Sequence, residues 1–487
     1  MRILMAASEG VPFSKTGGLA DVVGALPQAI ARLGHEVAVV LPRYRMTKLP
    51  EARTALASLT IPVGQKLHFP AVLEGPPLDG ARTFFIEYPP YFDRDALYGT
   101  PEAGDHPDNP ERFTLFSRAV LETAKALFPP DVIHCHDWQS AMVPVLLNTL
   151  YAGDPAFERV GTLFTIHNLG YQGLFPPDVL AHLGLGWDLF QTERLEFWGK
   201  VNFLKGALVY SNYINTVSKK YAQEIQTEEY GFGLQGLLLR RADVVTGILN
   251  GVDYAQWNPG NDRLLAAHFT PEKLEGKRAC KKDLLAQFKL PAKNLDRPLV
   301  GIVSRFTAQK GADLIAQVAD QLTQEDFCLV ALGTGDAEYE QLFRRLAQEY
   351  PEKIAVRIAY DNTLAHKIEG GADMFLMPSR YEPCGLNQIY SLKYGTIPVV
   401  RATGGLDDTI EPYDPATGAG TGFKFHDYTG QALLDTLRAA LHVYKNREGW
   451  TRLMRNAMAK DFSWDASARE YAGLYQKILG MGRAAGA

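Results

Sequence analysis

Residues 1–21 read MRILMAASEGVPFSKTGGLAD, and this stretch decides the fold. Its apolar run at residues 2–7 predicts a buried strand, Gly17-Gly18 predicts a tight turn, and a helical pattern follows over residues 21–33. A strand, a glycine turn and a helix start form a site where backbone N–H groups and the helix dipole attract an anion. The same frame returns as TGGLDD at residues 403–408. Two such sites predict two α/β halves that close on a single phosphorylated ligand.

Strands and helices alternate along the rest of the chain. This alternation, with short Gly and Pro punctuation, predicts parallel sheets wrapped by helices. In the first half we expect a polar, Pro-rich excursion up to residue 111, a helix at 141–150, and strands at 36–41, 131–135 and 161–166. In the second half we expect helices at 312–322, 387–394 and 467–479, and strands at 299–304, 327–332, 354–358, 374–377 and 397–400.

A turn-rich stretch at residues 250–262 predicts the connection between two domains. We expect an N-terminal domain over residues 1–250, a C-terminal domain over residues 251–466, and a final helix within residues 467–487 that packs back across both. In open α/β sheets, ligands bind outside the carboxyl ends of the strands. The site is therefore expected in a cleft between the domains, lined by loops from both.

The composition excludes several classes of protein. The chain has 487 residues, 46% of them hydrophobic, and its net charge of −5 with both signs mixed lacks the basic stripe of a nucleic-acid-binding protein. No apolar run approaches the roughly 20 residues of a membrane span. The four cysteines have no CxxC spacing and fit reduced thiols, and the first strand leaves no room for a signal peptide. We expect a cytoplasmic enzyme.

The first glycine loop carries a charge suited to phosphate. Gly18 lets the backbone approach a ligand closely, Lys15 adds a point charge, and the loop ends at Asp21. The loop is neither a GxxxxGK[ST] P-loop nor a GxGxxG fingerprint, which disfavours a P-loop ATPase or a dehydrogenase. The alternative is a simple tight turn.

A second candidate loop reads SRFTAQKG at residues 304–311. Arg305 follows a predicted strand, and Lys310 stands just before a predicted helix. Together they can grip two phosphate groups, Arg as a planar fork and Lys as a point charge. The alternative is a solvated surface pair.

A third candidate loop reads SRYEPCGLN at residues 379–387. Glu382 is a carboxylate on a strand-to-helix loop, where catalytic groups concentrate. Cys384 and Gly385 offer backbone N–H groups at a helix start. The alternative for Cys384 is a buried structural thiol, and it has no candidate base nearby in sequence that would make it a nucleophile.

The motif HCHDW at residues 134–138 invites comparison with metal sites. The dinuclear hydrolase pattern, HxHxDH, would need other residues at its last two positions, which disfavours a metal. We expect instead that Asp137 and the pair His167-Asn168, from the next strand end, hold sugar hydroxyls, and that Trp138 offers a platform for a sugar face. The alternative for the first histidine is a satisfied side chain at a strand end.

Taken together, the motifs resemble those of bacterial glycogen synthases and plant starch synthases, which use ADP-glucose. KTGGLADV, HCHDW, TIHNLGYQG, the NGVD turn at residues 250–253, SRFTAQKG, PSRYEPCGLNQ and TGGL occur in the family's order over essentially the whole chain. The resemblance implies a GT-B fold, with two Rossmann-like doubly wound domains facing a central cleft. It also implies retaining transfer of glucose from ADP-glucose to the non-reducing 4-hydroxyl of an α-1,4-glucan, without metal or cofactor.

The same resemblance assigns roles to individual residues. It implies catalytic roles for Glu382, which matches the family's essential carboxylate, and for His167, Arg305 and Lys310. Arg305 and Lys310 match the grip on the pyrophosphate, and Tyr360 matches the residue that stacks on adenine. Substrate binding is assigned to loop residues of both halves, namely Lys15, Gly18, Asp21, Asp137, Trp138, Asn168, Asn250, Tyr360, Cys384, Gly385, Leu386, Thr403, Gly404 and Gly405.

Three positions depart from the pattern of related enzymes. The wider superfamily often has a second Glu eight positions after the first, where this chain has Tyr390. Asn387 replaces a usual Thr, and Asp407 stands where Ala is more common. Because no Asp or Glu adjoins His167 in the sequence to act as a nucleophile, we expect front-face substitution instead of a double displacement.

Three other functions fit parts of the pattern. A related GT-B enzyme would use UDP-glucose or another acceptor, as relatives of sucrose or trehalose synthase do. A non-catalytic glucan-binding protein is a second alternative, although Glu382, Arg305 and Lys310 are all intact. A PLP-dependent phosphorylase shares the architecture, but no region resembles the one that holds its cofactor lysine.

Overall fold

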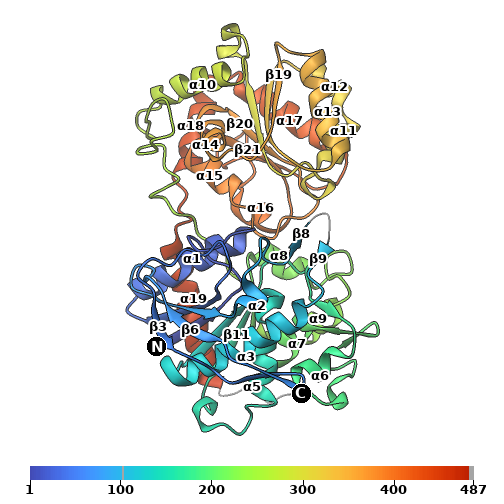
Figure 1. Cartoon of the computed structure of the whole chain (residues 1–487). Coiled ribbons are helices and arrows are strands. Elements are labelled where there is room, and N and C mark those ends of the chain that lie inside the picture. The colour runs from blue at the N-terminus through green and yellow to red at the C-terminus, as the bar shows by residue number, and fades with distance from the viewer. Residues whose placement is uncertain (101–103, 482–487) are drawn as a thin grey trace. The chain divides into compact units, whose positions relative to one another are not determined.

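The computed structural model describes residues 1–100 and 104–481, and the chain separates into two compact units (Figure 1). The first unit consists of Met1–Val217, Ala222–Gly251 and the described residues from Trp464 onward. The second unit consists of Ser218–Tyr221 and Val252–Ser463. The chain therefore passes from the first unit to the second after Gly251 and returns at Trp464.

A nine-stranded sheet forms the centre of the first unit. The pairs from β16 to β7 are parallel, whereas β7–β6 and β6–β3 are antiparallel. Among the parallel strands, β7-β2-β1-β10-β11-β15 follow the chain order 3-2-1-4-5-6 of a Rossmann sheet. Across the sheet the strands are β16 (Val245–Gly247), β15 (Tyr213–Thr216), β11 (Gly161–Ile166), β10 (Val132–His136), β1 (Arg2–Ala6), β2 (Glu36–Pro42), β7 (Arg82–Glu87), β6 (Ala71–Glu74) and β3 (Arg53–Leu56).

The second unit contains a six-stranded, wholly parallel sheet with the same order, 3-2-1-4-5-6. In such sheets the strand order reverses at one point, and ligands bind at the carboxyl ends beside it. The reversal lies between β1 and β10 in the first unit and between β17 and β20 in the second. The strands are β19 (Ile354–Ile358), β18 (Cys328–Gly333), β17 (Leu299–Val303), β20 (Met374–Met377), β21 (Ile397–Arg401) and β22 (Phe423–Phe425).

Along the chain, helices alternate with the parallel strands of both sheets (Figure 1). The helices up to β16 are α1 (Gly18–Arg32), α2 (Pro89–Phe92), α3 (Asn109–Leu127), α4 (Asp137–Ser140), α5 (Met142–Asn148), α6 (Val179–Leu183), α7 (Phe203–Tyr210), α8 (Lys219–Glu224) and α9 (Gln235–Arg240). The later ones are α10 (Glu275–Gln287), α11 (Ala312–Gln317), α12 (Ala319–Gln324), α13 (Ala337–Glu349), α14 (Asn362–Gly371), α15 (Asn387–Lys393), α16 (Gly404–Thr409), α17 (Gly430–Tyr444), α18 (Arg447–Met458) and α19 (Trp464–Met481).

The C-terminal helix α19 is part of the first unit's core. Its aromatic and aliphatic face packs with α1 and β11. Tyr475 and Tyr471 are buried and bond to the sheet through His134 at 2.9 Å and Asn215 at 2.9 Å. A Cβ at Gly161, the first residue of β11, would lie 2.2 Å from the Ile478 side chain, so the helix packs closely only because this position is glycine. Helix α19 thus packs against the sheet that contains the first strand of the chain.

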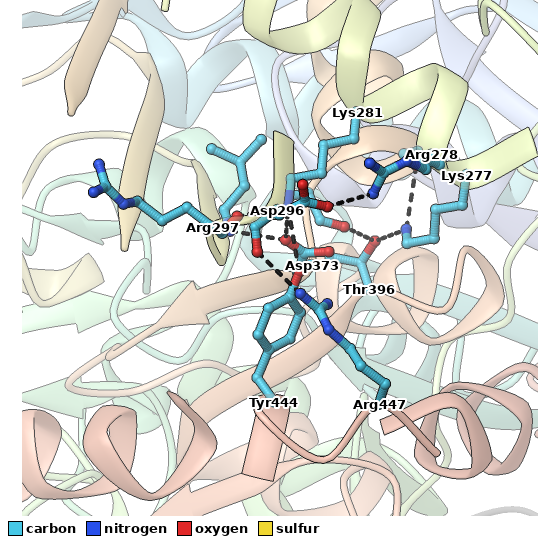
Figure 2. Close-up of polar contacts among 12 residues, drawn as sticks. Lys277, Arg278, Lys281, Asp296, Arg297, Asp373, Thr396, Tyr444 and Arg447 are labelled. Carbon is cyan, nitrogen blue, oxygen red and sulfur yellow. Dashed lines mark hydrogen bonds and ion pairs between the residues drawn. The ribbon is translucent and has the colours of Figure 1, made fainter. Parts of the chain in front are cut away.

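Two buried lysines fix α10 to the second sheet (Figure 2). Lys281 Nζ donates to Asp373 Oδ2 at 2.6 Å, and the same carboxylate accepts the backbone N–H of Leu299 at 2.8 Å. Lys277 Nζ donates to Thr396 Oγ1 at 2.7 Å, and burial lowers the pKa of Lys277 to about 8. Asp373 and Leu299 lie at the amino ends of β20 and β17. This network is therefore structural. It lies at the amino ends of the strands, away from the carboxyl ends where ligands bind.

The structure differs from the predicted elements in three places. The region expected to be an excursion contains β3, β6, β7 and the start of α3, because short apolar runs such as Phe84-Phe85-Ile86 in β7 are buried between polar flanks. The helix predicted at 312–322 is interrupted at Val318 and forms α11 and α12. Helix α1 begins at Gly18 and not at residue 21, so the second glycine of the loop lies in its first turn.

Candidate active site

The second unit holds a buried charge pair where its strand order reverses. Lys310 follows β17, and Glu382 follows β20. Lys310 Nζ donates to Glu382 Oε2 at 2.5 Å, and Ser379 Oγ donates to the same oxygen at 3.1 Å. Only 7% of Glu382 is exposed. Because an uncompensated buried carboxylate is strongly unfavourable, the ammonium group of Lys310 is what makes this placement of Glu382 possible.

The second glycine loop packs against the backbone that carries Glu382. Gly405 N–H donates to the carbonyl oxygens of Glu382 and Pro383 at 3.1 and 3.2 Å. Gly404 has a φ of 45°, and a Cβ there would lie 1.9 Å from the Glu382 carbonyl oxygen. A Cβ at Gly405 would lie 1.8 Å from the Cys384 carbonyl oxygen. Both positions require glycine, so this loop determines where Glu382 stands.

Arg305 lies on an exposed part of the loop after β17. Its Nη2 donates to Gln309 Oε1 at 3.0 Å, and a guanidinium has further N–H donors for a ligand. The end of β18 supports this loop, because a Cβ at Gly333 would lie 1.8 Å from the carbonyl oxygen just before Arg305, and one at Gly335 would lie 2.2 Å from that just after it. The sequence analysis missed this GTG turn, although two glycines directly after an apolar strand were the available signal.

The other predicted residues of the second unit lie on loops that follow the carboxyl ends of the strands. Tyr360 stands between β19 and α14 with 88% of its surface exposed, which leaves a ring for stacking. Thr403 is buried and stands at the N-cap position of α16. Cys384 is buried, Gly385 has a φ of 69°, and Leu386 immediately precedes α15.

The three positions that depart from the family pattern have structural roles. The Asn387 amide donates to the last carbonyl of β17 at 2.7 Å, which ties α15 to the strand beside the site. Asp407 Oδ1 accepts from Lys424 Nζ at 2.7 Å. Tyr390 stacks on Trp257 with 3.9 Å between ring centroids and 6° between planes. Each side chain therefore has a partner within the second unit.

The first unit gathers an aspartate and two histidines at its own reversal point. His136 ends β10 and Asp137 follows it, while His167 follows β11. His136 Nδ1 and His167 Nε2 are 3.0 Å apart. Asp137 accepts the backbone N–H groups of His167, at 2.7 Å, and of Asn168. The φ of Asp137 is 55°, an uncommon value for a residue other than glycine, although Asp tolerates it better than most.

Burial governs the charge of this group. It lowers the pKa of His167 to about 3 and that of His136 well below its ordinary value. It raises the pKa of Asp137 to about 7, against the opposing effect of the two backbone N–H groups. The two imidazoles are therefore neutral at physiological pH, and no positive charge arises on them.

Glu9 is a candidate site residue that the sequence analysis missed. It follows β1 and is 3% exposed. Its carboxylate accepts the Thr16 backbone N–H and, at 3.0 Å, the Thr16 hydroxyl, so it holds the first glycine loop. Burial raises the pKa of Glu9 to about 7 despite these bonds, and its charge in turn raises the pKa of Asp137. The available signal was an acidic residue directly after an apolar strand.

The first glycine loop differs from the second in what surrounds it. A Cβ at Gly17 or Gly18 would meet no described atom within 4 Å. Packing therefore does not require glycine at either position, whereas it does in the second loop. Lys15 Nζ pairs with the Asp21 carboxylate at 2.7 Å in a half-exposed ion pair. These features leave the backbone and the ammonium group of this loop accessible to a ligand.

His134 is the satisfied histidine given above as the alternative. Its Nδ1 and Nε2 lie 2.9 Å from Tyr475 Oη and 2.7 Å from Thr165 Oγ1, and it is fully buried. Within residues 1–100 and 104–481, no group of three or more His, Cys, Asp or Glu side chains is arranged to hold a metal. The HCHDW motif therefore combines a structural histidine with the Asp137 turn.

Trp138 and Asn250 are both buried. Trp138 is 8% exposed and packs edge-to-face on Phe113 and Phe175, with ring centroids 5.0 and 5.7 Å apart. This packing leaves little of its face for a sugar and does not support the platform predicted for it. Asn250 is 6% exposed, and its side-chain oxygen has no hydrogen-bond partner among the described residues.

Known proteins resemble this chain along its whole length. A family model described as the starch synthase catalytic domain matches residues 2–240, and one described as glycosyl transferases group 1 matches residues 286–456. A glycogen synthase from Koribacter versatilis is 61% identical over 98% of both chains. This chain belongs to the glycogen synthase family. A glycogen synthase from Moorella thermoacetica is 46% identical over 100% of this chain and 98% of its own.

Two solved structures show the fold to which this chain belongs. The catalytic domain of starch synthase IV from Arabidopsis thaliana, bound to ADP and acarbose, superposes with a TM-score of 0.88 at 34% identity, covering 98% of this chain and 99% of that one. A sucrose-phosphate synthase from Thermosynechococcus elongatus shares the fold with a TM-score of 0.61 at 20% identity. The predicted family, the two Rossmann-like domains of the GT-B fold and the glycosyltransferase class are thereby confirmed. No described helix is both long and apolar enough to cross a membrane.

Proposed function

We propose that this enzyme transfers glucose from ADP-glucose to the non-reducing 4-hydroxyl of an α-1,4-glucan such as glycogen, with retention of configuration. Its relatives are named glycogen synthases, and the solved starch synthase was bound to ADP and acarbose. The observation that carries the proposal is the Lys310–Glu382 pair at the reversal point of the second sheet. We further propose a reducing, cytoplasmic setting, in keeping with the buried free thiols of Cys135, Cys280 and Cys328.

Two cations of the second unit suit the departure of a diphosphate. Negative charge grows on the leaving group as the bond to the anomeric carbon breaks, and fixed donors beside it lower the barrier. Lys310 uses one of its three donors on Glu382, and Arg305 uses one N–H on Gln309. The remaining donors can bind phosphate oxygens. We therefore propose that the reaction needs neither a metal ion nor a cofactor.

Retention can arise from a double displacement or from substitution on one face of the sugar. The structure brings the carboxylate of Asp137 into contact with the backbone N–H of His167, so a carboxylate does lie beside this histidine. Backbone N–H groups already occupy this carboxylate, and burial raises its pKa to about 7, so part of it is protonated at neutral pH and cannot attack as a nucleophile. We propose substitution on the front face. The bond from C1 to phosphate breaks, the bond from C1 to the acceptor O4 forms on the same face, and the departing phosphate takes the hydroxyl proton.

The uncharged state of His167 fits this proposal. Positive charge develops at the anomeric carbon in the transition state, so a cation beside the sugar would raise the barrier. Burial lowers the pKa of His167 to about 3 and prevents this. Asp137 fixes the backbone of His167 and Asn168 and so acts on the sugar through them, as a positioning residue.

The tautomer of His167 follows from its neighbour. His136 Nε2 is buried and has no partner among the described residues. A buried N–H without a partner is rarer than a buried acceptor without one, so we assign the proton of His136 to Nδ1, where it donates to His167 Nε2 at 3.0 Å. The neutral His167 then carries its proton on Nδ1. That N–H is a donor for a sugar hydroxyl.

A donor assay tests the proposed function. Purified enzyme is incubated with glycogen and either ADP-glucose or UDP-glucose, and nucleotide release and glucan elongation are both measured. We expect faster turnover with ADP-glucose than with UDP-glucose, and a strongly reduced turnover in Glu382→Gln. Faster turnover with UDP-glucose would indicate a different donor, and no release with either would indicate a glucan-binding protein. A glucosyl adduct trapped on Asp137 would refute front-face substitution.

A further inference from the structure

Two turns of the first unit hold an aromatic residue in the left-handed backbone region. Trp198 has a φ of 52° and is followed by Gly199 at 75°, and Phe232 has a φ of 47° and is followed by Gly233 at 84°. A bulky side chain is rare in this region, and turns of this kind favour Asn or Asp before the glycine. The backbone therefore gives no reason for a large ring at either turn, and a function outside the fold is indicated.

The rings are exposed, but the turns that carry them are firmly held. Trp198 is 83% exposed at the tip of the hairpin formed by β13 (Glu196–Phe197) and β14 (Lys200–Asn202). The Gly199 N–H donates to the Glu196 carboxylate at 2.8 Å and closes the turn. The buried ammonium group of Lys205 donates to the Thr192 carbonyl, which precedes β13, and to the carbonyl of Glu196, the first residue of β13. These bonds fix the backbone of the hairpin, and the ring of Trp198 is exposed at its tip.

The two turns lie side by side and connect to the turn that carries Asn168. A Cβ at Gly233 would lie 3.5 Å from Trp198 Nε1. The buried amide of Gln172 donates to the Phe232 carbonyl at 3.1 Å and to the Leu169 carbonyl at 3.2 Å. These bonds fix the Phe232 turn to the loop that follows β11, which carries His167 and Asn168.

A third exposed aromatic residue stands on that same loop. Tyr171 is 60% exposed, and its N–H donates to the Asn168 carbonyl at 3.2 Å. Phe232 is 40% exposed, and a Cβ at Gly170 would lie 3.6 Å from its ring. Neighbouring turns therefore contact one another in sequence, starting at the predicted sugar site. They carry Asn168, Tyr171, Phe232 and Trp198 in that order.

We propose that Tyr171, Phe232 and Trp198 form a glucan-binding surface, on which successive glucose units of the acceptor chain stack beyond the site of transfer. This inference rests on the proposed function for the identity of its ligand. The C–H faces of glucose rings are apolar and lie well on aromatic rings, while the Tyr hydroxyl and the Trp N–H can bond to sugar hydroxyls. The continuity of the surface with the Asn168 loop favours a chain of sugars over a protein partner.

Trp198→Asn is the sharpest test, because Asn suits the left-handed turn and removes the ring. Glycogen affinity is measured by native affinity electrophoresis and maltoheptaose affinity by calorimetry, both without a sugar donor. We expect the dissociation constants to rise about fivefold to tenfold, the range of one well-placed aromatic contact. The melting temperature should stay equal or rise, since the strained ring is gone. The KM for glycogen should rise by the same factor, and the KM for ADP-glucose should not.

Trp187→Ala provides the matched control. Trp187 is also an exposed tryptophan of the first unit, at 67%, and it makes none of the contacts that join the three turns. Its glucan affinity should equal that of the wild type. Tyr171→Ala provides a second variant on another loop and should weaken glycogen binding as Trp198→Asn does.

The outcomes separate this inference from the proposed function. Folded Trp198→Asn and Tyr171→Ala variants that bind glycogen as tightly as the wild type would overturn the surface. So would a change of oligomeric state with unchanged glucan affinity, because a protein would then occupy the surface. A wild type that binds glycogen through these rings but transfers no glucose from ADP-glucose would refute the donor and leave the surface standing.

Discussion

Removing the buried carboxylate of Glu9 should change how the stability of this enzyme depends on pH. Glu9 is 3% exposed, and burial raises its pKa from 4.5 to about 7 in the folded state. Because the folded-state pKa exceeds the unfolded value, folding takes up a proton between these two pH values. The stability that this group contributes is therefore fully present below pH 4.5 and is lost as the pH rises through about 7.

The size of the effect follows from the two pKa values. With values of 4.5 and about 7, ionisation of Glu9 removes about 2.5 kcal/mol of folding free energy between about pH 5 and about pH 8. In Glu9→Gln this group no longer titrates. The variant loses one hydrogen bond to Thr16, but that loss is the same at every pH. Asp137 and the other titrating groups are present in both proteins and largely cancel in the comparison.

The measurement is the free energy of unfolding in urea for wild type and Glu9→Gln across this pH range. We expect the difference in stability, variant minus wild type, to rise by about 2.5 kcal/mol from about pH 5 to about pH 8. Glu111→Gln, which changes a more exposed carboxylate of the same unit, serves as the control for the Glu-to-Gln exchange itself. A flat difference for Glu9→Gln would show that Glu9 is ionised in the folded protein like an exposed carboxylate, and the reasoning from burial would be wrong.

Further predictions concern the two glycine loops and the charge pairs. Glu382→Gln should reduce kcat far more than it changes the donor KM, because it removes stabilisation of the transition state; a mere rise in KM would make Glu382 a binding residue. Lys310→Ala should weaken ADP binding by about 1–3 kcal/mol, measured by calorimetry, and unchanged binding would remove Lys310 from the site. Gly404→Ala should lower both stability and kcat, since its Cβ would clash with the Glu382 carbonyl, whereas Gly18→Ala should leave the melting temperature nearly unchanged and affect the donor KM. Asp373→Ala should destabilise the enzyme by about 3–5 kcal/mol in urea unfolding, because a buried lysine loses its partner.

The sequence predicted the second unit more completely than the first. Its strands are apolar runs followed by glycine or polar loops, so the sequence alone places Arg305, Lys310 and Glu382 on loops that join a strand to a helix. The structure brings Lys310 and Glu382 into contact because β17 and β20 are neighbours at the reversal point. Strand order is a long-range property, and local periodicity alone could not show that these loops meet.

The first unit shows what local patterns cannot reveal. Glu9 is a single polar residue after a strand, and its importance arises from burial and from its bonds to Thr16, which no spacing rule encodes. Trp138 is the opposite case, because it was predicted to bind a sugar and is instead buried. Its residue type suggested a sugar platform, but Trp138 is 8% exposed and packs edge-to-face on Phe113 and Phe175. In both cases the surroundings in the folded chain, and not the residue type, determine the role.

The two glycine loops look alike in sequence but differ physically. In the second loop, Gly404 and Gly405 are required because the backbone around Glu382 comes within 2 Å of where their Cβ atoms would be. In the first loop, nothing described lies within 4 Å of the corresponding positions at Gly17 and Gly18. A glycine without a packing requirement leaves room for close approach of a ligand. We therefore propose that the second loop positions the carboxylate of Glu382 and that the first loop stays open to the substrate.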